Sequence, residues 1–219
     1  MAILSPSDAA RVREMLGAMV NPVRLAFFTQ TLNCETCEPT GQILKELAEL
    51  SDLVSVEEHN LLLERDEAAK LGIDRVPAIA VLGADDPGIR FLGIPSGYEF
   101  MSLLDAVLSV SKADSGLQEG SRALIAALES PITLQVFVTP TCPHCPQAVS
   151  LANRMAVESP KVTSVIVEAS EYPDLVRKYR VSGVPKTVVN ERVEILGSRP
   201  EEDFVRTAVG AAPWTPAAG

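Results

Sequence analysis

The sequence predicts an α/β protein built from two tandem copies of one unit, and two observations carry this prediction. Apolar stretches of strand length alternate with stretches of helical periodicity along the chain. A Cys-x-x-Cys motif also occurs twice, each time followed by a Val-Pro dipeptide at one separation: Cys34 precedes Pro77 by 43 residues, and Cys142 precedes Pro185 by 43 residues. The copies are therefore offset by 108 residues, which is a common domain size.

Further landmarks repeat with a slightly smaller offset. Residues 91–93 (Phe-Leu-Gly) recur as 195–197 (Ile-Leu-Gly), and Phe100 recurs as Phe204, each after 104 residues. The difference between the two offsets fits a longer turn at 83–88 in the first copy, where Gly, Asp and Pro favour a turn.

The first unit is expected to begin with an amphipathic helix near 7–20. An apolar strand at 23–29 follows and runs directly into the first cysteine pair. A helix is predicted over 37–50, and 52–57 (Asp-Leu-Val-Ser-Val-Glu) alternates between polar and apolar residues, as a half-buried strand does.

The rest of the first unit contains a short helix, a hairpin and a closing helix. The helix is predicted at 61–71, the two hairpin strands after the Val-Pro dipeptide at 78–83 and 88–93, and the closing helix at 97–110. The polar residues 111–116 then form the predicted linker to the second unit.

The second unit follows the same order of elements. Its helices are predicted at 117–128, 143–158, 172–180 and 201–210, and its strands at 132–138, 162–168, 186–190 and 192–197. The proline-rich tail after Gly210, which contains the single tryptophan Trp214, is expected to be poorly ordered.

Composition limits the classes of function. The chain has 219 residues, a net charge of −10, 47% hydrophobic and 22% charged residues, which favours a packed globular protein. The negative charge repels polyanions, and no cluster of Lys and Arg provides a local exception, so neither nucleic acid nor an anionic membrane surface is an expected partner. A cationic leader and a long apolar segment are both missing, and we therefore expect a cytoplasmic protein.

All four cysteines fall into two Cys-x-x-Cys pairs, which favours redox chemistry. A disulfide across a two-residue gap closes almost no loop, so it would stabilise the fold very little. A structural zinc site is the alternative, because thiolates at this spacing also suit tetrahedral Zn²⁺. Cys37 and Cys142 are 105 residues apart, however, far more than the roughly 15 to 20 residues between the halves of a four-cysteine zinc motif.

Each cysteine pair is predicted to lie where a strand ends and a helix begins. The unpaired N–H groups and positive dipole end of a helix N-terminus favour a thiolate. We expect the first cysteine of each pair, nearer the exposed end, to attack a partner's disulfide and the second to resolve the mixed disulfide. Cys142 is then the attacking and Cys145 the resolving residue, with Cys34 and Cys37 as the matching pair.

The dipeptides inside the two motifs predict different redox potentials. Pro143 and His144 favour a stable thiolate at the second site, His144 by placing a positive charge or a donor near the sulfur. Glu35, in Glu35-Thr36, places a negative charge beside the first-site sulfur and opposes ionisation. A more stable thiolate stabilises the reduced form, so the second site is predicted to be the more oxidising.

Taken together, the strand, the cysteine pair and the distant Val-Pro dipeptide resemble the thioredoxin superfamily. The tandem arrangement resembles the protein disulfide oxidoreductases, or glutaredoxin-like proteins, of thermophilic archaea and bacteria. The similarity covers residues 5–210 and is most specific in the segment from 168–173 (Glu-Ala-Ser-Glu-Tyr-Pro) to 184–186 (Val-Pro-Lys).

This resemblance implies a fold and a set of domains. Each half would be a thioredoxin-like unit with a central mixed β-sheet flanked by helices. The first unit would span 1–112, the second 117–210, and a tail 211–219 would follow.

The resemblance also implies roles for residues outside the cysteine pairs. Pro77 and Pro185 would be cis and would pack against the active sulfurs. The backbones of Val76 and Val184 would bind an extended substrate peptide. Neither a bound cofactor nor a metal is implied, and electrons would pass to or from a thioredoxin-reductase-like flavoenzyme.

One residue expected from thioredoxins is missing. Their buried carboxylate lies six residues before the first cysteine, where this chain has Phe28 and Val136. Proton transfer would then use water or Glu168, with Glu57 or Glu58 as candidates in the first half.

The predicted function is therefore that of a protein disulfide oxidoreductase, which reduces, forms or reshuffles disulfides in protein substrates. One alternative is a dedicated electron carrier to a peroxiredoxin-type partner. The other is a peptide-binding or zinc-holding module without enzymatic activity on the same fold.

Overall fold

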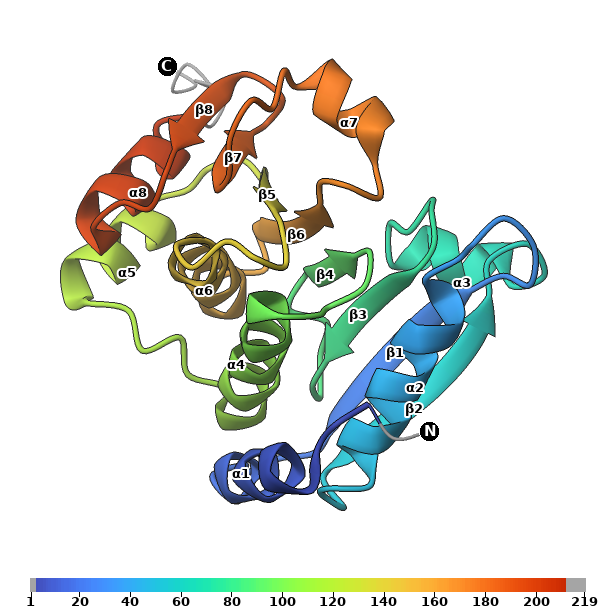
Figure 1. Ribbon diagram of the computed structural model, residues 1–219. Helices are drawn as coiled ribbons and strands as arrows, with labels where there is room; N and C mark the ends of the chain where they lie inside the picture. The colour runs from blue at the N-terminus through green and yellow to red at the C-terminus, as the bar shows by residue number, and fades with distance from the viewer. Residues whose placement is uncertain (1–2, 212–219) are drawn as a thin grey trace.

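Two halves of the chain repeat one order of elements (Figure 1). This computed structural model describes residues 3–211, so the predicted tail from 212 and Trp214 lie outside the described residues. The elements of the first half are α1 (Pro6–Leu16), β1 (Val23–Thr29), α2 (Cys37–Ala48), β2 (Val54–Asn60), α3 (Arg65–Lys70), β3 (Ala78–Leu82), β4 (Ile89–Leu92) and α4 (Tyr98–Lys112). Those of the second half are α5 (Glu119–Ala126), β5 (Ile132–Val138), α6 (Cys145–Glu158), β6 (Val162–Glu168), α7 (Pro173–Lys178), β7 (Lys186–Val189), β8 (Val193–Leu196) and α8 (Glu201–Val209).

The strands of both halves join into one mixed sheet. Within residues 3–211 the sheet has eight strands in the order β2-β1-β3-β4-β6-β5-β7-β8. The pairs β1 with β2, β4 with β6, and β5 with β6 are parallel, and the other neighbours are antiparallel. The mixed α/β architecture predicted from the sequence is confirmed, and the two half-sheets are continuous through the β4–β6 pair.

Each predicted helix and strand has a counterpart within residues 3–211, and the errors lie at the element boundaries. The strands predicted at 23–29, 132–138 and 162–168 have these bounds in the structure. β2 continues to Asn60 because it pairs with the full length of β1, up to Thr29.

The helix predicted to begin at residue 61 is delayed by a turn. The Asn60 side chain accepts the N–H groups of Leu62 and Leu63, at 3.0 and 3.2 Å, and the Glu64 N–H donates to the Asn60 carbonyl at 2.9 Å. Side-chain bonds of this kind favour a turn over a helix, so α3 begins only at Arg65.

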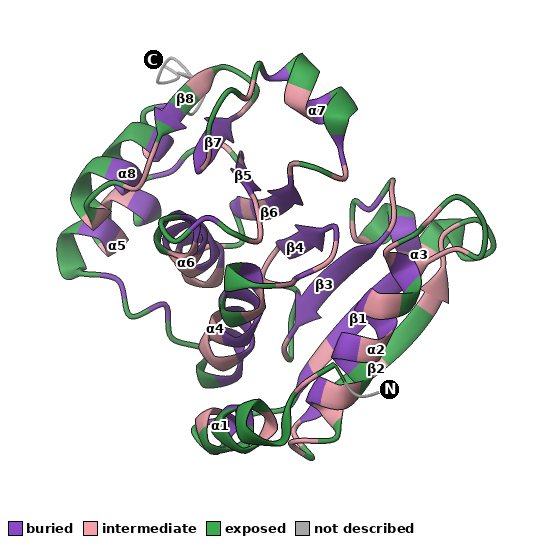
Figure 2. Ribbon diagram, in the orientation of Figure 1, coloured by how far each residue is buried: buried purple, intermediate pink, exposed green. Residues whose placement is uncertain are grey.

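The helices cover the two faces of the sheet unequally (Figure 2). One apolar cluster contains buried side chains from α1, α2, α4, α5, α6 and α8, and from inward residues such as Leu25 of β1 and Leu134 of β5. On the other face, α3 and α7 contribute Ala68 and Leu175 to a smaller cluster. Both helices that begin at a cysteine pair, α2 and α6, therefore lie on the same face.

The predicted linker is partly buried. Ser111 still belongs to α4 and is fully buried, and Ser115 is 4% exposed. The Ser111 hydroxyl donates to the Asn21 carbonyl at 2.6 Å and accepts the Val20 N–H at 2.9 Å. The small polar residues predicted a linker here, and hydrogen bonds to the segment before β1 allow the Ser111 hydroxyl to be buried.

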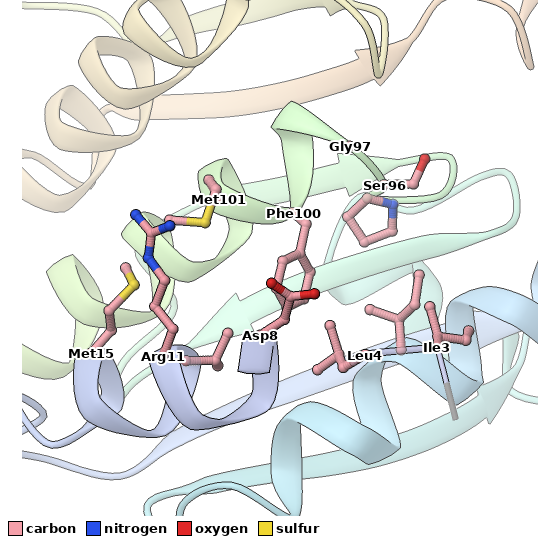
Figure 3. A pocket seen from close by; sticks show the side chains of 12 residues that line it. Ile3, Leu4, Asp8, Arg11, Met15, Ser96, Gly97, Phe100 and Met101 are labelled. Atoms are coloured by element: carbon pink, nitrogen blue, oxygen red, sulfur yellow. The ribbon is translucent and has the colours of Figure 1, made fainter. Parts of the chain in front are cut away.

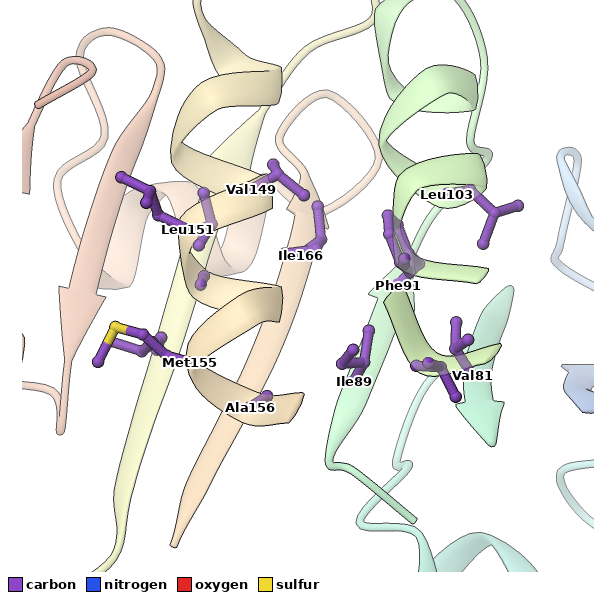
Figure 4. Packing of buried hydrophobic residues seen from close by; sticks show 14 of the residues in the cluster. Val81, Ile89, Phe91, Leu103, Val149, Leu151, Met155, Ala156 and Ile166 are labelled. Carbon is purple, nitrogen blue, oxygen red and sulfur yellow. The ribbon is translucent and has the colours of Figure 1, made fainter. Parts of the chain in front are cut away.

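Apolar packing continues across the junction of the halves. Phe91 and Leu103 of the first half belong to the same cluster as Val149 and Ile166 of the second (Figure 4). On the same side, the Ser150 hydroxyl of α6 donates to the Asp105 carboxylate of α4 at 2.8 Å. The two halves thus share one core rather than packing through a polar interface.

Gly97 allows a close approach between the halves outside the sheet. It has φ +59°, a conformation that favours glycine, and a Cβ there would lie 2.3 Å from the Pro140 carbonyl oxygen. The next residue, Tyr98, donates its N–H to that oxygen at 3.0 Å. The N-terminus of α4 is therefore held against the loop that leads to Cys142.

We predict that Gly97→Ala destabilises the protein by about 2 kcal/mol or more, because the methyl group strains the backbone and displaces a backbone oxygen. Thermal and urea unfolding would measure the change. Gly120→Ala is the matched control: a Cβ at Gly120 in α5 meets no atom within 4 Å, so it should be neutral or stabilising by up to about 1 kcal/mol. Equal effects of the two substitutions would contradict the proposed close approach.

Candidate redox sites

Both cysteine pairs lie at the same edge of the sheet. Each pair follows the C-terminal end of its strand, and the strand pairings make β1 and β5 parallel. Four strand spacings of about 4.8 Å separate β1 from β5, which places the two sites on the order of 20 Å apart along that edge. A partner could reach both sites from one side of the molecule.

In the second site, the cysteine pair meets the distant Val-Pro loop. Cys142 and Cys145 form a disulfide with Cα atoms 5.5 Å apart. The Cys142 sulfur lies 3.8 Å from the Val184 carbonyl oxygen, and the bond from Val184 to Pro185 is cis. Cys142 is 8% exposed and Cys145 is fully buried, so Cys142 is the more accessible sulfur of the pair.

The first site has the same disulfide and the same cis Val-Pro bond, and its first cysteine is more exposed. Cys34 and Cys37 form a disulfide with Cα atoms 5.4 Å apart, and the bond from Val76 to Pro77 is also cis. Cys34 is half-buried, whereas Cys37 is 4% exposed. The disulfide opens into a hollow of about 830 Å³, for which the second site has no counterpart among the main hollows formed by residues 3–211.

Both helices that begin at a cysteine pair lack a side-chain cap at their N-terminus. Thr36 and His144, the residues before α2 and α6, make no side-chain capping hydrogen bond to these helices. In α6 the Cys145 N–H donates to the Cys142 carbonyl at 3.4 Å and Pro146 has no N–H, so the positive end of the helix, rather than a free N–H of these two residues, favours a thiolate. α6 begins at Cys145 rather than at the predicted residue 143, so Pro146, and not Pro143, occupies its first turn.

The second half contacts the first site directly. The Thr36 hydroxyl, between the two cysteines, donates to the Glu171 carboxylate, which also accepts the Ile94 N–H at 2.6 Å. The Tyr172 hydroxyl donates to the Pro77 carbonyl at 3.1 Å. The loop after β6 therefore brings a negative charge close to the first cysteine pair. These contacts join residues 77 to 135 positions apart, and no pattern in the sequence indicated them.

Two carboxylates are buried where the halves meet. Glu168 is 4% exposed, not solvated at its strand end, and accepts hydrogen bonds from Ser170 and from the Glu171 N–H at 2.9 Å. Glu99, in the first turn of α4, is 2% exposed, and neither of its oxygens has a hydrogen-bond partner among the described residues. Sequence reasoning missed Glu99, because a glutamate in the first turn of a helix is normally exposed.

Burial raises the pKa of Glu99 to about 7, and the nearby negative charge of Glu168 acts in the same direction. Glu99 lies two residues after Gly97, which touches Pro140, so it sits beside the loop of the second cysteine pair. It is a carboxylic acid that gains and loses a proton near neutral pH.

The first-half candidates for proton transfer are in a different environment. Glu57 and Glu58 are exposed and pair with Arg24 at 2.6 Å and with Lys45 at 3.5 Å, respectively. The structure thus gives these two carboxylates ion-pair partners and buries Glu99 and Glu168.

A separate apolar hollow of about 270 Å³ lies between α1, α2 and the start of α4 (Figure 3). Side chains of α1, among them Asp8 and Arg11, face Phe100 and Met101 of α4. Gly97 forms part of its wall, but no cysteine lines it. The hollow therefore lies apart from both disulfides.

Metal-binding clusters and membrane-spanning helices are both absent from residues 3–211. This part of the chain contains no group of three or more His, Cys, Asp and Glu side chains placed to hold a metal ion. None of the helices described there combines the length and the apolar character needed to cross a membrane.

Comparison with known proteins places the chain among redox proteins. A family model described as a thioredoxin domain matches residues 132–210. The crystal structure of a protein disulfide oxidoreductase from Aeropyrum pernix superposes with a TM-score of 0.89 and 33% identity, over 95% of this chain and 93% of that one. The N-terminal domain of the alkylhydroperoxide reductase AhpF from Enterococcus faecalis gives 0.87 and 26%, over 94% of this chain and 99% of that one.

Longer curated proteins also match. An alkyl hydroperoxide reductase from Pseudomonas putida is 32% identical over 71% of this chain and 32% of its own length. A protein named NADH dehydrogenase from Ferdinandcohnia aciditolerans is 26% identical over 96% of this chain and 38% of its own length. The chain thus spans about a third of the length of these relatives.

We predict that Glu99→Gln changes the pH dependence of stability. Between pH 4.5 and about 7 the folded protein keeps a proton on Glu99 that the unfolded chain has lost, so this group lowers the free energy of unfolding as pH rises through that range. The loss amounts to about 3 kcal/mol and is complete above pH 7. Glu99→Gln should remove it, so the variant gains stability relative to the parent as pH rises from 4.5 to 8.

Urea unfolding at several pH values would measure this effect. Glu119→Gln, at an exposed position in the first turn of α5, is the control and should leave the pH profile unchanged. Parallel profiles for parent and Glu99→Gln would show that the pKa of Glu99 is the same in the folded and unfolded protein, which would contradict the effect of its burial.

Proposed function

The chain belongs to the thioredoxin-fold protein disulfide oxidoreductases, and on that premise we propose that Cys142 and Cys145 form its main catalytic pair, with Cys34 and Cys37 as a second exchange centre. The observation that carries the proposal is the 3.8 Å contact between the Cys142 sulfur and the Val184 carbonyl. It brings the more accessible sulfur to the loop where a substrate backbone would bind. Dithiol–disulfide exchange is the activity of the family, whereas the residue roles are our assignment.

The proposed reduction step balances within the cysteine pair. The Cys142 thiolate attacks one sulfur of the substrate disulfide, a mixed disulfide forms, and the other substrate sulfur leaves as a thiolate. The Cys145 thiolate then attacks Cys142 and releases the second substrate thiol. One protein dithiol is oxidised and one substrate disulfide is reduced, and the reverse sequence oxidises a substrate dithiol.

The Val-Pro loops supply the proposed binding surface. A substrate peptide would add to the backbone of Val184, or of Val76 in the first half, by strand-like hydrogen bonds. Pro185 and Pro77 donate no hydrogen bond, so they would leave the adjacent sulfur free to react. Val184 and Val76 are only half-buried, which is consistent with access by a peptide.

Charge around the cysteines supports different roles for the two pairs. The exposed His144 stands beside the second pair, and we propose that it stabilises the Cys142 thiolate. Glu35 and the Glu171 carboxylate both lie near the first pair and oppose ionisation there. We propose that the buried carboxylates Glu99 and Glu168, at the junction of the halves, supply the proton to Cys145 when it leaves.

A flavoenzyme similar to thioredoxin reductase is the proposed electron donor or acceptor, and the cytoplasm is the proposed compartment. A second candidate function is electron transfer to a peroxiredoxin-type partner. The observation that favours it is the match, over 94% of this chain, to the N-terminal domain of an alkylhydroperoxide reductase AhpF. The two functions use the same cysteine chemistry and differ in the partner.

We predict that the protein catalyses reduction of insulin by dithiothreitol. Cys142→Ser should lower the rate strongly because it removes the attacking sulfur, whereas Cys145→Ser should accumulate a mixed disulfide with insulin. Insulin precipitation and gel analysis after acid quenching would measure these effects. Stoichiometric zinc in untagged protein, together with no turnover, would instead support a zinc-holding module, and selective turnover with a peroxiredoxin would favour the carrier function.

We also predict that the second pair is the more oxidising. In variants that keep one pair at a time, the Cys142 thiol should lose its proton at lower pH than the Cys34 thiol, with about 30 mV of potential for each pKa unit between them. Iodoacetamide trapping against pH and redox titration would measure both quantities. A pKa of the Cys142 thiol equal to or higher than that of the Cys34 thiol would contradict the proposed electrostatic difference between the two sites.

A further inference from the structure

The surroundings of the two cysteine pairs differ because the two half-sheets are joined on one side only. β6 is an interior strand, so the loop after it packs against the first half through Glu171 and Tyr172. β2 is an edge strand with many exposed residues, and the corresponding loop, 61–64, has no such cover (Figure 2). The first disulfide therefore lies in an open hollow bordered by Glu64 of this loop and by residues of the segment 29–38.

Acidic groups dominate the border of this hollow. The acidic side chains that line it are Glu35, Glu38, Glu58 and Glu64, and all four are exposed. Lys45 is the one basic side chain among the lining residues, and it lies 3.5 Å from Glu58. Hydrogen bonds from His59 and the Asn60 N–H lower the pKa of Glu64, so it is ionised at neutral pH. The hollow therefore has an excess of negative charge around the disulfide.

Three leucines on the same two loops are exposed to solvent. Leu32 is 75% exposed, Leu62 58% and Leu63 83%. The loops are fixed side by side, because the Leu61 N–H donates to the Thr29 carbonyl at 3.0 Å. We call these three leucines and the four glutamates the first-site rim.

We propose that the Cys34–Cys37 pair exchanges disulfides with basic polypeptide segments that carry an apolar side chain near their own disulfide. The proposal rests on the exchange activity proposed for this pair and adds its substrate class. The glutamates of the rim attract a positively charged segment, and the exposed leucines offer an apolar contact that burial would make favourable. Glutathione disulfide, which is anionic, is repelled by the same charges.

The exchange itself follows the steps given for the second pair. The Cys34 thiolate attacks the substrate disulfide and releases one substrate thiolate, and the Cys37 thiolate then attacks Cys34 and releases the other. Two protein thiols become a disulfide and one substrate disulfide becomes two thiols. No further oxidant or reductant takes part in this half-reaction.

Small disulfides of different charge test the glutamates. The full chain with Cys142→Ser and Cys145→Ser keeps only the first pair, and its reduced form can be mixed with doubly cationic cystamine, uncharged bis(2-hydroxyethyl) disulfide or doubly anionic glutathione disulfide. Acid quenching and chromatography give the rates. The readout is the ratio of the cystamine rate to the glutathione disulfide rate. The fraction of Cys34 present as thiolate cancels in this ratio. Dividing it by the same ratio measured with dithiothreitol corrects for the intrinsic reactivity of the two disulfides.

We expect this normalised ratio to be about 10 or more at low ionic strength. The normalised rate of the uncharged disulfide should lie between the rates of cystamine and glutathione disulfide. It should approach one near 1 M salt, where charges are screened over about 3 Å. Glu38→Gln with Glu58→Gln should lower the ratio at low ionic strength.

A matched control removes two carboxylates elsewhere. Glu119 lies in the first turn of α5, as Glu38 does in α2, and Glu202 pairs with Arg206 at 2.5 Å, as Glu58 pairs with Lys45. Glu119→Gln with Glu202→Gln changes the net charge equally, but on helices of the second half that do not border the hollow. It should leave the ratio unchanged.

Disulfide-linked peptides test the leucines. A peptide with Lys and Leu beside its cystine should react faster than one with Glu and Leu, and also faster than one with Lys and Ser. Leu62→Ser with Leu63→Ser should slow the Lys-Leu peptide while leaving cystamine unaffected, and unfolding curves would confirm that these exposed substitutions leave the fold intact.

The outcomes separate this inference from the proposed function. Rates that do not depend on probe charge, or a preference for glutathione disulfide, would refute the acidic specificity while leaving exchange by Cys34 in place. An equal fall of the normalised ratio in the Glu119→Gln, Glu202→Gln control would show that the net charge of the protein, and not the first-site rim, determines the preference for cationic disulfides. No reaction with any disulfide would instead contradict the exchange role of the first pair itself.

Discussion

The parallel pairing of β4 with β6 is the constraint on which the rest of the molecule depends. It joins two half-sheets into one and fixes β1 and β5 in the same direction, so both cysteine pairs emerge at one edge. It also brings α4 against α6, where one apolar cluster spans both halves. A different joining of the halves would leave each unit intact but change the relative placement of the two redox centres.

This joining is asymmetric, and the asymmetry distinguishes two otherwise similar sites. The second half uses its strand β6 at the junction, whereas the equivalent strand β2 of the first half stays at an outer edge. As a consequence, Glu171 and Tyr172 contact the first site from the second half, while the start of α4 approaches the second site from the first half. Each redox centre is thus completed by residues of the other half.

Electrostatics at the sites follows from the same arrangement. The carboxylate that thioredoxins bury before the first cysteine is replaced here by Phe28 and Val136, both fully buried. Two other carboxylates, Glu99 and Glu168, are buried at the junction of the halves. A low dielectric environment makes such groups sensitive to protonation, so the junction can influence chemistry that the local motif does not specify.

By itself the sequence determined the repeated unit, the order of its elements, the two cysteine pairs and the two Val-Pro loops, because these are recorded in local periodicity and in spacings that recur. The first residues of α3 and α6 were predicted less well. Hydrogen bonds to the Asn60 side chain and the turn at Cys142 compete there with helix formation. Only the tertiary structure decided that Glu99 and Ser111 are buried and that Glu171 reaches Thr36. Those facts depend on contacts between residues distant in sequence, and burial of a polar side chain is set by what packs over it rather than by its neighbours along the chain.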